Sequence, residues 1–253
     1  MIKLKSESDL EFLKVSGRIL ASTLFFLKET AKEGVTLKFL DELAHKSLKE
    51  AGATPAFLGY KSEGAGRPYP ASICTSLNQQ IVHGLPINYS LQSGDILKID
   101  LGVNYNGYFT DAAVTVGIGQ ISKEASKLIS VTELALHKAI AECSPGKRLG
   151  DIGWIIEKIT EGAGFSVVRG LTGHGTGFEL HEDPTVYNFG KRGEGIELKA
   201  GLVLAIEPMI NIGSGEIKQQ KDDSFATKDG SLNAHFEHTV AITKNGPLIL
   251  TKF

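Results

Sequence analysis

An internal repeat constrains the fold of this chain more than any other feature of its sequence. Two predicted pairs of helices, one ending near Gly52 and the other near Gly164, align with each other at a constant spacing. The aligned positions hold small or branched apolar residues: Gly34, Leu37, Leu40, Leu43, Ala51 and Gly52 fall on Gly146, Leu149, Ile152, Ile155, Ala163 and Gly164. Leucine-rich helices also resemble one another by chance, so the helices alone do not decide whether the chain is duplicated.

The strands that follow each helix pair strengthen the repeat, because each carries an acid at the same end. Asp100 closes an apolar run that begins with glycine, and Glu207 closes a run of the same design. Later in each half a second acid leads into another apolar strand, Asp111 in the first half and Glu237 in the second. We therefore expect two similar α+β halves that each contribute an acid pair to a shared cleft, a common location for ligand sites.

Capping and chain-breaking residues predict where the helices begin and end. A capping-box pattern from Ser8 to Glu11 opens the first helix. The other three helices are expected over residues 37–51, from about 122 to 144, and over 148–161.

Length and composition indicate a soluble cytoplasmic protein. The 253 residues are expected to form one domain, 1–253, with halves of roughly 8–120 and 121–253. The only two cysteines are Cys74 and Cys143, so a disulfide framework is not expected and a reducing compartment is favoured. No apolar run approaches the ~20 residues that cross a bilayer. The net charge of −2, without a basic run, gives no support for nucleic-acid binding.

Asp100 and Asp111 are predicted to lie close together across a hairpin. Asn106-Gly107 is a strong signal for a type I′ turn, and pairing about that turn places Asp111 opposite position 102. Side chains alternate along a strand, so both carboxylates lie on one face, at most about 7–8 Å apart. Two metal ions about 3.5–4 Å apart would fit between them. The alternative is a pair of solvated acids, but burying an unpaired carboxylate in the apolar strand around Asp100 would be costly.

Glu207 and Glu237 are the corresponding acids of the second half. Glu207 ends the near-continuous apolar run 202–206, which indicates a strand buried on both faces. Glu237 precedes the apolar strand that begins at His238. Each acid alone is more often a salt-bridge partner than a metal ligand. Four acids at equivalent points of two repeats instead favour a shared metal-binding cleft.

Histidines beside a glycine-rich bend could add nitrogen ligands. His174 and His181 stand in the stretch Gly173–Pro184, where three alternating glycines permit an irregular backbone. Their spacing would place them on opposite faces of a regular strand, so they converge only if the glycines bend the chain. His83 is a weaker candidate by itself. The sequence contains no serine-nucleophile elbow, no phosphate loop and no His-Glu-x-x-His motif, and Cys74 has no obvious base.

Five segments of the chain resemble, in order and spacing, the signature blocks of the type I methionine aminopeptidases. They are Val82–Pro86, the pair Asp100 and Asp111, Gly173–Gly177, Ile206–Met209 and Phe236–Thr239. The resemblance covers nearly the whole chain. It implies the pita-bread fold, an α+β architecture of two pseudo-symmetric halves with antiparallel sheet and helices packed outside. It also implies the family's reaction, the metal-dependent removal of the initiator methionine from new proteins and peptides whose second residue is small.

The resemblance further implies a dinuclear metal site. Its five ligands would be Asp100, Asp111, His174, Glu207 and Glu237. By matching position, Asp111 and Glu237 would bridge both ions. Asp100 would complete one ion, and His174 and Glu207 would complete the other. Four carboxylates and one imidazole suit divalent Mn, Fe or Co, with Zn as a further option.

Catalytic and substrate-binding roles are implied in the same way. Glu207 would be the acid/base that moves the proton of the attacking water. His181 and His83 would contact the peptide carbonyl and amide and stabilise the tetrahedral intermediate. The methionine pocket would be lined by Phe57, Tyr60, Tyr69, Cys74 and Leu180. Leu180 stands where the family usually has an aromatic residue, and Asp223 where a tryptophan is expected, so the departures concern specificity rather than chemistry.

Related families offer alternative identifications, and features of the sequence argue against each of them. Proline-specific aminopeptidases and prolidases resemble the chain but carry a large extra N-terminal domain. Type II methionine aminopeptidases carry a helical insertion, for which the stretch between His174 and Glu207 leaves no room. A catalytically dead pita-bread binding protein would have lost ligands, and none is lost here. The expected partners are peptide and nascent-protein N-termini near the ribosome, and a monomer is expected.

Overall fold

The computed structural model describes residues 2–61 and 66–252. Its helices lie close to the predicted ranges: α1 (Glu7–Thr30), α2 (Leu37–Glu50), α3 (Lys123–Ala141) and α4 (Leu149–Gly162). One predicted boundary is wrong, because Ser8 lies inside α1 and the capping box is formed by Ser6 and Asp9. Both Ser6 and Ser8 precede an acid by three positions, so the sequence offers two overlapping boxes. Within the described part of the chain, no helix is long and apolar enough to span a membrane.

In the part of the chain that the structure describes, the strands form four antiparallel sheets. The sheet of the first half contains β1 (Thr54–Pro55), β2 (Cys74–Leu77), β4 (Ile96–Tyr105) and β5 (Tyr108–Gly117). The largest sheet of the second half contains β7 (Gly173–Gly175), β8 (Glu182–Val186), β9 (Val203–Ile206), β14 (His238–Thr243) and β15 (Gly246–Ile249). One small sheet contains β6 (Ser166–Val167), β10 (Met209–Asn211) and β13 (Asn233–His235). The other contains β3 (Gln80–Val82), β11 (Ile217–Gln219) and β12 (Phe225–Thr227).

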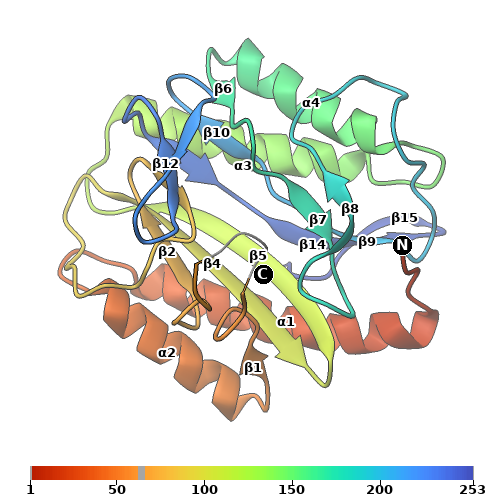
Figure 1. Ribbon diagram of the computed structural model, residues 1–253, viewed down its shortest axis with the longest axis horizontal. Helices are drawn as coiled ribbons and strands as arrows, with labels where there is room; N and C mark the ends of the chain where they lie inside the picture. The colour runs from red at the N-terminus through yellow and green to blue at the C-terminus, as the bar shows by residue number, and fades with distance from the viewer. Residues whose placement is uncertain (1, 62–65, 253) are drawn as a thin grey trace.

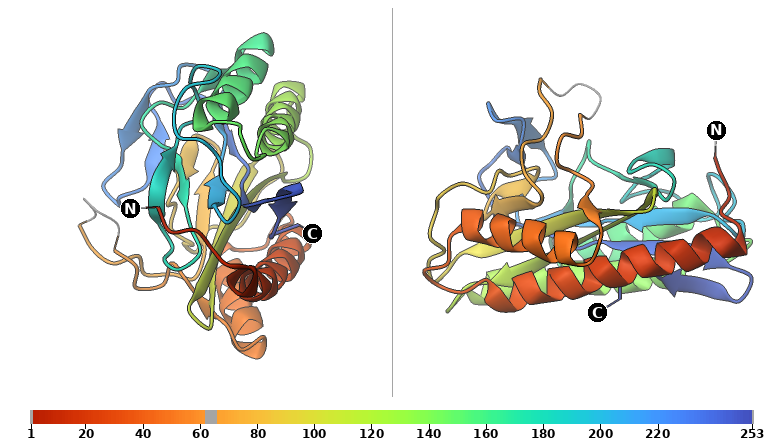
Figure 2. Two further views of the ribbon diagram at one scale, coloured as in Figure 1. Left: turned by 90° about the vertical axis from the view of Figure 1, so that its right-hand side faces the viewer. Right: turned by 90° about the horizontal axis from the view of Figure 1, so that it is seen from below.

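Each half packs its pair of helices against its own strands. In Figure 1 α1 and α2 lie along one side of the strands, and α3 and α4 lie along the opposite side. The turned views in Figure 2 show α1 running most of the length of the molecule. Apolar residues at helical spacing, among them Leu20, Leu24 and Leu27 of α1, are completely buried. The arrangement agrees with the predicted α+β fold, in which helices pack outside antiparallel sheets.

The hairpin of β4 and β5 confirms the predicted register. Asn106 and Gly107 have positive φ values of 53° and 84°, as a type I′ turn requires. Asp111 lies opposite Gly102, the position that pairing about the turn predicts. Asp100 therefore stands diagonally across from Asp111, with both side chains on the same face of the sheet.

Strand β5 of the first half is hydrogen-bonded to the second half on both sides of Glu237. The Thr239 hydroxyl accepts a hydrogen bond from the Asp111 amide at 2.8 Å and donates one to the Asp111 carbonyl at 2.7 Å. The Thr115 hydroxyl makes the same two-way link with the backbone of His235, at 2.9 and 2.6 Å. These bonds fix the acids of the two halves relative to each other.

Candidate metal centre and active site

Three carboxylates, two from the first half and one from the second, meet where β5 joins the second half. Oxygen atoms of Asp100, Asp111 and Glu237 all lie within 4.8 Å of one another. Glu237 occupies the short gap between β13 and β14. The three residues are only 9%, 3% and 2% exposed. The predicted convergence of Asp100 and Asp111 on one cleft is therefore confirmed.

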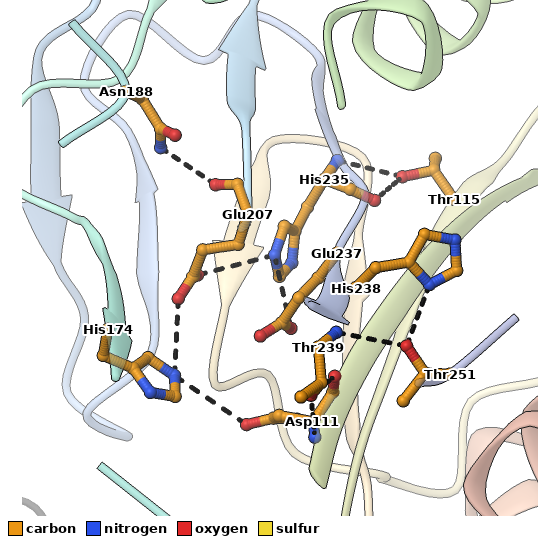
Figure 3. Close-up of polar contacts among 10 residues, drawn as sticks. All are labelled: Asp111, Thr115, His174, Asn188, Glu207, His235, Glu237, His238, Thr239 and Thr251. Carbon is orange, nitrogen blue, oxygen red and sulfur yellow. Dashed lines mark hydrogen bonds and ion pairs between the residues drawn. The ribbon is translucent and has the colours of Figure 1, made fainter. Parts of the chain in front are cut away.

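Glu207 and His174 extend this carboxylate cluster on the side of the second half. Glu207 directly follows β9, and His174 lies in the neighbouring strand β7. Figure 3 shows the His174 ring pointing toward both Glu207 and Asp111, with Nε2 3.6 Å from Glu207 Oε1 and 4.0 Å from Asp111 Oδ2. Donor atoms of His174, Glu207 and Glu237 also fall within 4.8 Å of one another. The five residues predicted as ligands thus form one continuous cluster.

The tautomer of His174 follows from its backbone contact. Its Nδ1 lies 2.9 Å from the carbonyl oxygen of Gly175, and a carbonyl only accepts, so Nδ1 carries the proton. Burial lowers the pKa of the His174 ring to about 4, which keeps the ring neutral near pH 7. Nε2 is therefore left with a lone pair that faces the carboxylates, the arrangement of a metal-binding imidazole whose other nitrogen is held by a carbonyl.

The cluster is a poor arrangement for carboxylates alone. Burial, then repulsion between neighbouring acids, raises the pKa of Asp111, Glu207 and Glu237 well above the ordinary range, and burial raises that of Asp100 to about 7. Oxygen atoms of Asp100, Asp111 and Glu237 are buried without a hydrogen-bond partner among the described residues. Divalent cations would supply the missing partners for these oxygens and offset the repulsion. The donor set of four carboxylates and one imidazole thus fits the metals expected from the sequence.

His181 and His83 line the same cavity as the carboxylate cluster. The rings of His181 and His174 are 4.3 Å apart, so the glycine-rich segment bends as predicted and brings the two histidines together. His181 Nδ1 lies 2.7 Å from the Tyr60 hydroxyl. His181 also comes within ligand distance of Asp111 and His174, which places it closer to the cluster than its predicted role in substrate binding requires. The His83 ring packs edge-on against Phe225.

The five residues predicted to line the methionine pocket gather in one place. Phe57, Cys74 and Leu180 form a small buried cluster, against which Tyr60 and Tyr69 pack. The rings of Phe57 and Tyr69 meet edge to face, with centroids 6.4 Å apart. The cluster adjoins the carboxylates, because Cys74 of β2 pairs with Asp100 of β4. All five residues line the cavity that contains the carboxylates, and Asp223 lines it as well.

Sequence reasoning missed several residues that hold the cluster. His235 lies between Glu207 and Glu237 (Figure 3). Asn188 Nδ2 donates to the backbone carbonyl of Glu207 at 2.9 Å. The ammonium of Lys98 is fully buried and donates to two backbone carbonyls. Two of the three could have been found from strand alternation, since Lys98 and His235 each precede a predicted ligand by two positions in an extended segment.

Comparisons with known proteins agree with this geometry. The model of metallopeptidase family M24 matches residues 11–244. The methionine aminopeptidase of Clostridium perfringens is 48% identical over 252 residues, which is 99% of each chain. Methionine aminopeptidase 1 of Bacillus subtilis is 44% identical over 253 residues, which is 100% of both chains. The crystal structure of the methionine aminopeptidase from Thermotoga maritima superposes with a TM-score of 0.95 at 40% identity and covers 100% of both chains.

Prolidases share the fold more distantly. The prolidase of Pyrococcus horikoshii matches with a TM-score of 0.75 at 23% identity, and the present chain covers 63% of it. This likeness concerns the fold alone, and together with the Thermotoga maritima structure it confirms the predicted pita-bread fold. The family model spans nearly the whole sequence, and relatives far above 30% identity cover it from end to end, so the chain belongs to metallopeptidase family M24.

Proposed function

We propose that this protein is a methionine aminopeptidase of type I, which removes the N-terminal methionine from new proteins and peptides whose second residue is small. The observation that carries the proposal is the position of the acid–histidine cluster, which adjoins a buried apolar cluster in one cavity of about 890 Å³. The relatives at 44–48% identity bear the same name. Methionine should be released from Met-Ala-Ser in the presence of Mn²⁺, while an Xaa-Pro peptide should stay intact. Faster cleavage of the Xaa-Pro peptide would favour a prolidase-like activity instead.

The five clustered residues would hold two divalent metal ions, with Mn, Fe(II) and Co suited best to the donor set and Zn as a further option. The family resemblance implies that Asp111 and Glu237 would contribute to holding both ions, and the carboxylate of each belongs to two of the converging donor groups. Asp100 would complete one site, and His174 with Glu207 the other. When bound, the metals would act as Lewis acids and lower the pKa of the attacking water.

The chain's own residues would orient the peptide and move the proton. Glu207 is a buried carboxylate next to His174, a position that suits a group that accepts a proton from water and returns it to the leaving nitrogen. If the Tyr60 hydroxyl donates to His181 Nδ1, the Nε2–H of His181 is free to donate to the peptide carbonyl oxygen. His83 would contact the peptide amide from the opposite wall. Its pKa is lowered by burial, so it would act as a neutral hydrogen-bonding group.

The proposed substrates are flexible N-termini that emerge from the ribosome in the cytoplasm, and the enzyme would act as a monomer. Only an extended end of a chain can place its first side chain in the apolar cluster and its peptide bond beside Glu207. The rim of the cavity includes Arg67, Asp222 and Asp223. Asp223, which is half-buried, would favour basic residues further along the peptide.

Removal of the metal is expected to lower the free energy of unfolding by a larger amount as the pH rises. In the metal-free protein, burial raises the carboxyl pKa of Asp100 to about 7 and those of Asp111, Glu207 and Glu237 further. The unfolded chain ionises the same groups near pH 4. The native state therefore binds more protons than the unfolded state above that pH, and the free energy of unfolding falls with rising pH until these groups ionise in the folded protein.

Metal binding requires the ionised carboxylates, so the stabilisation by metal should grow over the same pH range. This stabilisation can be measured by thermal unfolding with and without a fixed Mn²⁺ concentration, at several pH values from about 5 to about 8. The gap between the two midpoints should widen steadily. A gap of constant size would contradict the assignment of the buried carboxylates as metal ligands.

Leu180 is expected to loosen the methionine pocket without making it polar. Methionine should remain the preferred first residue, because its long thioether fills a slot lined by aromatic edges and the Cys74 sulfur. An apolar slot discriminates between apolar side chains of similar size by only ~1–3 kcal/mol, so leucine and norleucine should be cleaved more readily than by relatives with an aromatic residue at this position. Values of kcat/KM on a Met-, Leu- and norleucine-Ala-Ser series test this.

Leu180→Phe should restore discrimination against leucine. Leu85→Phe is a matched control, since Leu85 lines the same cavity outside the apolar cluster and should leave the Met/Leu ratio unchanged. A wild-type kcat/KM for methionine no higher than for leucine would contradict the methionine assignment itself.

A further inference from the structure

His235 is a buried histidine that the proposed reaction does not use. Its side chain is 1% exposed, and its Nε2 lies 3.6 Å from Glu207 Oε2 and 3.9 Å from Glu237 Oε2. Among the residues that the structure describes, neither ring nitrogen has a hydrogen-bond partner. Buried polar groups are nearly always paired, and one that is not calls for an explanation. An apolar side chain of similar volume could fill this space without that cost.

The backbone that carries His235 is fixed from several sides. His235 pairs with Met209 between β13 and β10, and its amide and carbonyl both bond the Thr115 hydroxyl. Two residues earlier, the carbonyl of Asn233 accepts a hydrogen bond from the Lys98 ammonium at 3.2 Å. The ring is therefore held between the two glutamates by strand pairing rather than placed there by a flexible side chain.

The neighbours of the ring indicate which of its two nitrogens carries the proton. A neutral imidazole offers one donor and one acceptor. The carboxylates of Glu207 and Glu237 both lie within 4 Å of Nε2. An ionised carboxylate only accepts hydrogen bonds, so these two neighbours favour the tautomer with the proton on Nε2.

The two oxygens of Glu207 are divided between His174 and His235. Oε1 lies 3.6 Å from His174 Nε2, which also faces Asp111, and Oε2 lies 3.6 Å from His235 Nε2 (Figure 3). In Glu237 the second oxygen, Oε1, is buried and has no partner among the described residues. Each glutamate therefore has one oxygen directed at His235 and another available for a cation.

We propose that His235 is a positioning residue of the metal centre, whose Nε2–H is directed at the carboxylates of Glu207 and Glu237, 3.6 and 3.9 Å away, and orients them as ligands. The proposal rests on the proposed function, since it requires that these glutamates bind metal. Among the described residues, one group of three donors whose atoms all lie within 4.8 Å of one another contains His174, Glu207 and Glu237, and no such group contains His235. His235 therefore belongs behind the ligands and not among them. Residues that hydrogen-bond to metal ligands in this way commonly affect metal affinity about 10–100-fold.

Four variants separate this role from simple packing. His235→Leu removes the donor and keeps the volume, and His235→Asn keeps an N–H group that is too short to reach the carboxylates. His235→Gln retains a donor at nearly the position of Nε2. His238→Leu is the matched control, because His238 is a buried histidine next to Glu237 whose Nδ1 bonds Thr251 instead.

Calorimetric titration of each metal-free variant with Mn²⁺ gives the decisive readout, and thermal unfolding of the same samples reports the fold. His235→Leu and His235→Asn should bind Mn²⁺ about 10–100-fold more weakly than the wild type. His235→Gln should bind close to the wild-type value, and His238→Leu should lose thermal stability alone. If His235→Leu does not fold, His235→Asn and His235→Gln still decide the outcome.

Two results would overturn the proposal. Wild-type Mn²⁺ affinity in a folded His235→Leu or His235→Asn variant would leave His235 with a packing role only. Equal loss in His235→Gln, together with one fewer imidazole nitrogen coupled to Mn²⁺ by electron spin echo spectroscopy than in the wild type, would make His235 a ligand. Failure of the wild type to bind metal would instead contradict the proposed function, which keeps the two conclusions distinguishable.

Discussion

Glu207→Gln is expected to lower kcat for methionyl peptides by about 10²–10⁴-fold, the usual contribution of a general acid/base. Glutamine keeps the shape of the side chain and one carbonyl oxygen that can contact a metal, but it cannot accept a proton from water. The rest of the site should stay in place, because the backbone of Glu207 is held by Asn188 at 2.9 Å. KM should change much less than kcat, since the loss concerns the transition state.

The measurement is steady-state kinetics on Met-Ala-Ser at saturating Mn²⁺. Under this condition a lower kcat cannot result from incomplete metal binding. Asp151→Asn provides a matched control. Asp151 is also a buried acid, but it caps α4, where it accepts hydrogen bonds from the amides of Arg148 and Gly193. Its replacement should cost roughly 0.5–2 kcal/mol of stability and leave kcat unchanged. If Glu207→Gln lowered kcat no more than this control, Glu207 would have no part in proton transfer.

The fold could be predicted from the sequence wherever local signals and the repeat agreed. Asn106-Gly107 specified the turn, the turn specified the register, and the register placed Asp111 opposite Gly102. The position of a residue such as Asp111 is predictable because the side-chain period of a strand and the geometry of a two-residue turn are both fixed. The prediction of the capping box was wrong because the sequence offers two overlapping boxes, Ser6 with Asp9 and Ser8 with Glu11. Local pattern does not decide between these two boxes.

The relation between the two halves could not be derived from local pattern. Glu237 is held beside Asp111 by tertiary hydrogen bonds on either side of it, from Thr115 to His235 and from Thr239 to Asp111. Both threonines look like ordinary members of apolar strands. The contact between Tyr60 and His181 likewise joins segments that are far apart in the chain. His235 was missed for another reason: a lone histidine in a strand is more often structural, and only its position between two glutamates marks it as unusual.

The architecture explains why a duplicated fold suits a site of this kind. Each half supplies two carboxylates at equivalent points, and β5 brings the two pairs together through its bonds to the second half. A single half would contribute only two of the four carboxylates and would leave them uncovered by the other half. Burial between the halves raises their pKa values instead, and a raised pKa together with unpaired oxygens is what makes the cluster receptive to cations.

His181→Ala and His174→Ala are expected to separate catalysis from metal binding, although the two rings are only 4.3 Å apart. His174 directs Nε2 at Glu207 and Asp111, so its removal should weaken one metal. His181 bonds Tyr60 through Nδ1 and leaves its other nitrogen for the peptide carbonyl. His181→Ala should therefore lower kcat by about 10²–10³-fold, the effect of removing one donor that stabilises developing negative charge.

Calorimetric titration with Mn²⁺, combined with kcat at saturating metal, distinguishes the two roles. His181→Ala should bind metal as the wild type does, whereas His174→Ala should show one weakened site. Tyr60→Phe gives a graded control: it removes only the hydroxyl 2.7 Å from His181 Nδ1, so it should lower kcat less than His181→Ala and leave metal affinity unchanged. The experiment is needed because a donor atom of His181 also lies within 4.8 Å of Asp111 and His174. Equal losses of metal affinity in the two histidine variants would make His181 a ligand and would transfer the stabilisation of the carbonyl to the metals and His83.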